Sequence, residues 1–211
     1  MARNFTAASS QSLEVASSPV SGPPFTLAAW ARPTGTGSST YVAVGELGGT
    51  HRYLLQQGFG GTNNVGASVT TPALAFGAST STGVAAGTWH HAAAVFTSNV
   101  SRTAYINGGN SATNTSSLTL NTPTSVVIGA RYNTTLGFYF GGDIAEVGIW
   151  NAALTADEIA SLAKGMSCDK VRPQSLVFYA PLVRDLIDQK GGRIITNNNG
   201  ATVANHPRVY A

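Results

Sequence analysis

The segment Phe138–Gly165 reads FYFGGDIAEVGIWNAALTADEIASLAKG, and it decides the fold class. Its first half predicts a β-strand, because side chains with a two-residue period alternate between two faces. One face carries Ala145, Val147 and Ile149, and the other carries Ile144, Glu146, Gly148 and Trp150. A strand of this kind indicates a sheet with one side turned towards a core.

The second half of the segment predicts one short helix over residues 155–164. Thr155 suits the N-cap, and Glu158 three residues later completes a capping box. Asp157 favours the positive N-terminal end of the helix, and Gly165 is a stop signal. A strand followed by a single capped helix is unusual in a chain that otherwise predicts only strands.

Outside this segment the chain predicts short strands separated by turns. Gly (24 residues) and many Ser, Thr and Asn residues favour turns, and the 211 residues suffice for one β domain with a real core. The predicted strands are Ser12–Val15, Phe25–Arg32, Tyr41–Leu47, Tyr53–Gln57, Ala67–Thr70, Leu74–Phe76, Trp89–Phe96, Arg102–Asn107, Leu118–Leu120, Ser125–Ala130, Gln174–Leu182, Ile194–Thr196 and Ala201–Val203. We therefore predict an all-β sandwich that forms a single domain over residues 1–211.

The charge content limits the partners that we expect. Only 10% of the residues are charged, against about 25% in an average globular protein. This predicts a surface largely covered by partner subunits, and hence a homo-oligomer, with a secreted domain that has an adhesive surface as the alternative. The net charge of +3 comes from scattered basic residues, so we expect no nucleic-acid partner.

Two further classes are disfavoured by the hydrophobic pattern. The sequence contains no run of about 18 apolar residues, so it predicts no membrane span. The first residues, MARNFTAASSQSLEV, lack the apolar stretch of a signal peptide. We therefore expect synthesis in a cytoplasm, or arrival outside the cell within an assembled particle. The single cysteine, Cys168, predicts a buried apolar residue and no internal disulfide.

Four motifs in order carry a family resemblance. They are FTLAAWARP at 25–33, GTWHHAAAVF at 87–96, RTAYINGG at 102–109 and FYFGGDIAEVGIWNAALTADEI at 138–159. This succession resembles the laminin-G/concanavalin A-like (LamG-like) jelly-roll family. The resemblance implies a two-sheet antiparallel jelly-roll sandwich, and Trp30, Trp89 and Trp150 fall within the motifs as core or sheet-face residues.

The C-terminal segment 174–211 resembles the part that usually opens such domains. It contains LVFYAPL at 176–182, which implies a circularly permuted chain with this strand beside the one near Leu13. The order is similar to LamG-like proteins of tailed bacteriophages. It implies a non-enzymatic virion structural protein, made in the host cytoplasm and exposed on the virion surface as a capsid decoration protein or a head or tail component. The expected partners are other virion proteins, such as the major capsid protein.

No pair of acidic residues suits bond cleavage. Glycoside hydrolysis needs two carboxylates at one substrate, and Asp143 and Glu146, three residues apart on a strand, are predicted to face opposite ways. We therefore predict no enzyme. His90 and His91 likewise face opposite sides, one packed and one hydrogen-bonded, whereas His51 and His206 are predicted to be exposed.

The resemblance also implies calcium as the usual ion of the family, held by hard oxygen ligands. The candidates are Asp143 above all, with Asn63, Asn64 and Asn133. Ala145 stands where the family often has an acidic residue, so we predict no cofactor and keep calcium as the alternative.

The alternative function is a carbohydrate-binding adhesin, with or without calcium. Sugar binding needs exposed aromatic platforms beside amide or charged groups. The candidate residues are Tyr132, Asn133 and Tyr139 in one turn, His51 and Arg52 at a hairpin tip, and Asn63 and Asn64 in a polar loop. The competing interpretation is that these aromatic side chains cover the core or fill a subunit interface.

Overall fold

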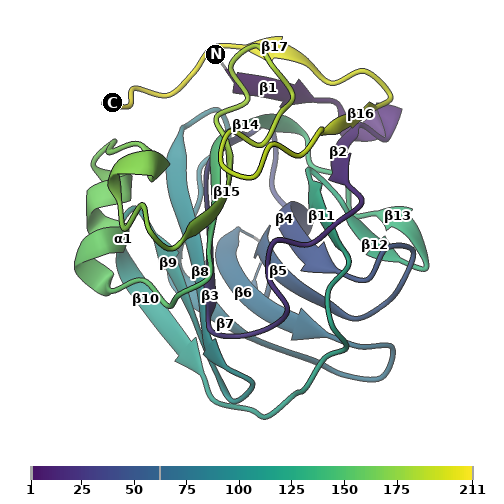
Figure 1. The fold of residues 1–211 in the computed structure, drawn as a ribbon, viewed down its shortest axis with the longest axis vertical. Coiled ribbons are helices and arrows are strands. Elements are labelled where there is room, and N and C mark those ends of the chain that lie inside the picture. Colours follow the sequence, from purple (N-terminus) through teal and green to yellow (C-terminus); the bar gives the residue numbers. More distant parts are fainter. Residues whose placement is uncertain (1, 62, 211) are drawn as a thin grey trace.

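The computed structural model describes residues 2–61 and 63–210, and it forms a sandwich of two antiparallel sheets (Figure 1). Sheet A follows the order β10 (Gly109–Asn114), β9 (Ser101–Ile106), β8 (His90–Ser98), β3 (Phe25–Pro33), β14 (Gly142–Trp150), β1 (Ala2–Phe5) and β17 (Thr202–Ala204), with β15 (Leu176–Ala180) also paired to β14. Sheet B follows the order β16 (Thr196–Asn198), β2 (Ser12–Val15), β11 (Ser125–Ile128), β4 (Ser39–Gly45), β5 (Arg52–Gln57), β6 (Asn64–Thr70) and β7 (Ala75–Gly83). The predicted all-β jelly-roll class is confirmed.

Smaller elements complete the fold. They are the hairpin of β12 (Arg131–Asn133) and β13 (Thr135–Gly137), helix α1 (Ala156–Ala163), and two short 3₁₀ helices, η1 (Ala7–Ser9) and η2 (Cys168–Lys170). The predicted strand Leu118–Leu120 does not form. No helix among the described residues is long and apolar enough to cross a membrane.

The main core lies between the two sheets. Phe25 and Phe96 of sheet A stack with ring centroids 4.8 Å apart, and Tyr53 of sheet B meets Phe25 edge-on at 4.9 Å. Apolar side chains from alternate positions of both sheets fill the remaining space, which is the arrangement expected of a β-sandwich. A second apolar cluster around Trp150 lies on the outer face of sheet A under α1.

A β-bulge breaks the alternation predicted for β14. Ala145 pairs with Trp30 and Gly148 with Ala28, so β14 carries one residue more than its partner, and Glu146 adopts a positive φ of 53°. Beyond such a bulge, each side chain lies on the opposite face of the sheet from the one that a regular strand would give it. Ile144 therefore joins Val147 and Ile149 in the core between the sheets, and the prediction that Ala145 shares a face with Val147 and Ile149 is wrong.

The first strand of the chain, β1, lies beside β17 of the C-terminal segment, and the circular permutation stays a prediction. Ala2 of β1 pairs with Ala204 of β17, and the C-terminal segment runs next to the first strand in Figure 1. The predicted neighbour of the strand near Leu13 is wrong, however. β15 pairs with β14 in sheet A, where it shares one edge of β14 with β1, a strand that the sequence did not predict. β2 instead pairs with β16 in sheet B.

Helix α1 starts at the predicted capping box. The Thr155 hydroxyl accepts from the Glu158 N–H at 3.3 Å, and Glu158 accepts from the Thr155 N–H at 2.7 Å. We expect Thr155→Ala to lower the free energy of unfolding by about 1 kcal/mol, since it leaves an N–H group of the first turn without its partner. Urea denaturation measures the change, and a variant as stable as the parent would contradict the role of the cap.

Candidate functional site

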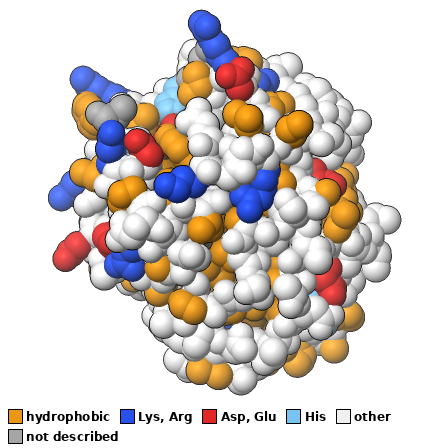
Figure 2. All heavy atoms as spheres, viewed as in Figure 1, with side chains coloured by type: hydrophobic (Ala, Val, Ile, Leu, Met, Phe, Trp, Pro, Cys, Tyr) orange, Lys and Arg blue, Asp and Glu red, His pale blue; other side chains and the backbone are white. Residues whose placement is uncertain are grey.

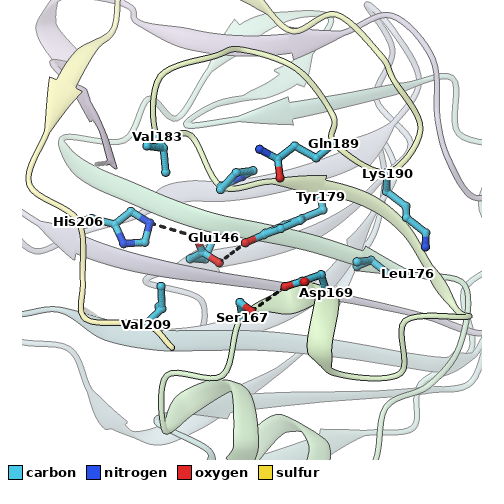
Figure 3. Close-up of a pocket in the computed structure, with 11 residues that line it drawn as sticks. Glu146, Ser167, Asp169, Leu176, Tyr179, Val183, Gln189, Lys190, His206 and Val209 are labelled. Carbon is cyan, nitrogen blue, oxygen red and sulfur yellow. Dashed lines mark hydrogen bonds and ion pairs between the residues drawn. The ribbon is translucent and has the colours of Figure 1, made fainter. Parts of the chain in front are cut away.

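A hollow with converging polar groups lies on the outer face of sheet A, at the β14 bulge (Figure 3). Here β1 pairs with one end of β14 and β15 with the other, so Glu146 sits at the junction. The cavity has a volume of about 590 Å³. Its lining comprises Glu146, Ser167, Asp169, Leu176, Tyr179, Pro181, Val183, Gln189, Lys190, His206 and Val209.

Glu146 is buried at the floor of this cavity and is held from two sides. The Tyr179 hydroxyl donates to Oε2 at 2.6 Å, and Nε2 of His206 lies 3.0 Å from Oε1. Burial raises the pKa of Tyr179, and the nearby Glu146 carboxylate raises it further, so the hydroxyl stays protonated and donates. His206 was predicted to be exposed; it is half-buried because the C-terminal segment folds back over β14.

Asp188 organises the loop that forms the upper wall. Its fully buried carboxylate accepts from the backbone N–H groups of Tyr179 at 2.9 Å and Lys190 at 3.0 Å, and it pairs with Arg193 at 2.7 Å. The side chains of Gln189 and Lys190 make no hydrogen bond to any described residue. Both residues line the cavity, and in Figure 3 the Lys190 side chain lies at its edge near Leu176.

The cavity gathers two carboxylates, those of Glu146 and Asp169, which the sequence did not predict to lie together. Asp169 comes from η2, and its Oδ1 accepts from the Ser167 hydroxyl at 2.6 Å. The prediction that Asp143 and Glu146 face opposite ways is also wrong, because the bulge turns Glu146 to the outer face of sheet A, where Asp143 also lies. Cys168, beside Asp169, is buried as predicted, and burial raises the pKa of its thiol.

Asp143 has protein partners away from the cavity. Its carboxylate accepts from Asn4 at 2.8 Å and from Nε of Arg32 at 2.7 Å. Within residues 2–61 and 63–210, no three His, Cys, Asp or Glu side chains cluster as a metal site. The calcium role of Asp143 stays a prediction.

Part of the predicted glycan set meets at the β12–β13 hairpin, on the outer face of sheet B. Nη2 of Arg52 donates to Oδ1 of Asn133 at 2.9 Å, and Tyr132 and Tyr139 pack against one small apolar cluster. His51 precedes Arg52 and is half-buried, with Nδ1 accepting from the Asn121 N–H at 3.3 Å.

The other predicted residues lie elsewhere. Asn63 and Asn64 lie near the end of β5 that carries Gln57, whereas Arg52 begins the same strand. The structure therefore divides the predicted set between two ends of sheet B. Whether either part binds a sugar stays a prediction.

The sequence comparison assigns the family. A family model described as the concanavalin A-like lectin/glucanase superfamily matches residues 7–160. The chain therefore belongs to this superfamily, as its motifs predicted. No curated protein matches the chain in sequence.

Solved structures with the same fold come from several contexts. A heptameric SAP-like pentraxin of Limulus polyphemus has a TM-score of 0.64 at 14% identity, over 93% of this chain and 89% of the pentraxin. A protein of Bacteroides ovatus named for carbohydrate binding has a TM-score of 0.70 at 18% identity, over 99% of this chain and 61% of that protein. The enzymatically active domain of tailspike protein 2 of bacteriophage CBA120 has a TM-score of 0.59 at 17% identity, over 85% of this chain and 29% of that domain. At these identities the similarity concerns the fold.

Proposed function

We propose that the protein binds carbohydrate in the Glu146 cavity and does not cleave it. The observation that carries the proposal is the convergence of free and fixed polar groups on one apolar-walled hollow. Glu146 supplies a carboxylate, Gln189 a free amide and Lys190 a free ammonium, above Leu176 and Val209. Hydroxyl groups of a sugar need such donors and acceptors, and its carbon face needs apolar walls. The similarity to a protein named for carbohydrate binding supports the proposal.

The ionisation of Asp169 and the hydrogen bonds of Glu146 favour binding of a sugar over its hydrolysis. A two-carboxylate mechanism needs one acid with a raised pKa. The Ser167 hydroxyl, with the Lys170 charge, holds the pKa of Asp169 below its ordinary value, so Asp169 stays ionised. Both oxygens of Glu146 already have protein partners.

A glycan array, probed with and without a chelator, tests this proposal. We expect binding to at least one saccharide and no release of sugar from that ligand on long incubation. Silence on every glycan would contradict the proposal, and measured hydrolysis would contradict its non-enzymatic part. Loss of the signal with the chelator alone would support the calcium-dependent form.

Removing the free polar groups locates the site. Gln189→Ala and Lys190→Ala are each expected to lower the affinity for the saccharide found on the array about tenfold, because one hydrogen bond contributes about 0.5–3 kcal/mol. Isothermal titration calorimetry measures the change, with Lys164→Ala as the control because Lys164 lies outside the cavity lining. Unchanged affinity in both variants would exclude the cavity, and Asn133→Ala then tests the hairpin.

We also propose that the protein is a virion-surface component, as a capsid decoration protein or a head or tail protein bound to other virion proteins. The low charge supports this, since Figure 2 shows a face with few charged side chains among many uncharged groups. The similar phage tailspike domain and heptameric pentraxin support phage association and a homo-oligomer. Mass spectrometry of intact virions tests the proposal; absence of the chain from the particles would contradict it.

A further inference from the structure

Two arginines on the outer face of sheet B lack the partners that buried cations normally have. Arg52 of β5 is 7% exposed and Arg131 of β12 is 9% exposed. Nη2 of Arg52 donates to Asn133, and Nη1 of Arg131 donates to Oε1 of Gln56. Both acceptors are neutral amides, so neither positive charge is balanced by them.

The acidic residues of this face are engaged elsewhere. Glu14 accepts from the Tyr132 hydroxyl at 2.7 Å. Glu46 accepts from the Asn121 amide at 2.6 Å and from the His51 N–H at 3.3 Å. Across residues 2–61 and 63–210, no carboxylate comes within ion-pair distance of Arg52 or Arg131.

Several buried polar atoms here also lack hydrogen-bond partners. They are Nε and Nη1 of Arg52, Nε of Arg131, and the hydroxyl oxygens of Ser68 and Thr70. Ser68 and Thr70 lie on β6, where Thr70 pairs directly with Arg52. Each unpaired buried donor costs about 1–3 kcal/mol. The two guanidinium groups carry three such donors, so the site favours a hydrogen-bond acceptor from outside the chain.

The two cations also repel each other. Burial and, as the smaller cause, the charge of Arg52 together lower the pKa of Arg131 to about 10. Burial likewise lowers the pKa of Arg52. An anion between the two guanidinium groups would offset both the burial and the repulsion.

We propose that Arg52 and Arg131 form a binding site for an oxyanion, a carboxylate or phosphate group carried by an acidic saccharide or present as free phosphate. Guanidinium groups match both anions through paired N–H donors. The exposed Phe138 ring, 3.5 Å beneath the Arg131 guanidinium, provides an apolar surface beside them. This site is separate from the Glu146 cavity, so either of the two proposals can be disproved without the other.

The anion enters from the hairpin side. The interior space beside Arg52 is only about 10 Å³, which is room for one water molecule. Asn133, in contrast, is exposed and holds Nη2 of Arg52 by a single hydrogen bond. The oxyanion therefore takes the place of the Asn133 amide and reaches the unpaired donors behind it.

Thermal unfolding with defined anions tests the proposal. Sodium phosphate and sodium glucuronate are compared with sodium chloride and glucose at equal ionic strength. At saturation we expect either oxyanion to raise Tm by about 5 °C relative to chloride, and glucose to have no effect. A response to glucuronate above that to phosphate identifies the acidic sugar as the source, and the reverse order identifies phosphate. No rise with either oxyanion would overturn the proposal.

The variant Arg131→Gln separates binding from folding. It removes one uncompensated charge, so without anion its Tm is expected to equal or exceed that of the parent, while the anion-dependent rise disappears. The control Arg172→Gln breaks the ion pair with Glu158 at 2.6 Å, and it is expected to lower Tm but keep the rise. An Arg131→Gln variant that keeps the full rise would overturn the proposal.

Discussion

Trp150→Ala is expected to lower the free energy of unfolding by about 3–5 kcal/mol, which is the usual cost of removing a buried tryptophan. Trp150 ends β14 and is 0% exposed, and its indole N–H donates to the Val171 carbonyl at 2.8 Å. It packs with Leu154 and Ile159, so it joins helix α1 to the outer face of sheet A. The truncation leaves a cavity and also an unpaired carbonyl.

Differential scanning calorimetry measures this loss, and the expected fall in Tm is about 6–20 °C for a chain of this size. Trp89→Ala is the matched control, because Trp89 is only half-buried beside Arg32, with the guanidinium carbon 5.4 Å from the ring. We expect Trp89→Ala to lower Tm clearly less than Trp150→Ala does. Equal losses in both variants would contradict the structural role of Trp150.

Mild acid is expected to destabilise the fold through its histidine pair. His90 faces the core, with Nε2 3.0 Å from the Tyr41 hydroxyl, and His91 packs edge-on to Trp30 on the other face, as the strand period predicted. Burial lowers the pKa of His90 to about 4, and burial together with the smaller effect of His90 lowers the pKa of His91 to about 3. Both rings therefore stay neutral in the folded state at pH 5.

The sign of the effect follows from the unfolded chain, where a histidine has a pKa of about 6.5. Above pH 6.5 both states are neutral and stability does not depend on these groups. Below it the unfolded chain binds protons that the folded chain refuses. The free energy of unfolding then falls by about 1.4 kcal/mol per pH unit for each histidine, or about 5 kcal/mol for the pair between pH 6.5 and 4.5.

Urea denaturation in half-unit pH steps measures the slope. His91→Gln removes one of the two titrating groups and is expected to halve the slope, and so is His90→Gln. The two single variants serve as controls for each other, because they lie on opposite faces of the same strand. If His91→Gln retained the whole slope, burial of this ring would not be the cause of the acid sensitivity.

The sequence by itself determined the class of fold and most strands. Short apolar runs bounded by turn residues, as in β3, β5 and β8, and the adjacent cap residues of α1 are local signals that need no knowledge of distant partners. It did not reveal β1, β10 or the β12–β13 hairpin. These strands have three to six residues, and most consist largely of the polar residue types that are common in turns.

Only the tertiary structure decided where the candidate sites lie. Glu146 and His206 are 60 residues apart in the chain, and they meet because β17 pairs with β1 and brings the C-terminal segment across β14. The bulge that turns Glu146 towards them adds one residue to a regular strand, and a two-residue period cannot reveal such an insertion in advance. Pairing between distant strands sets the register, and the register sets which face each side chain occupies.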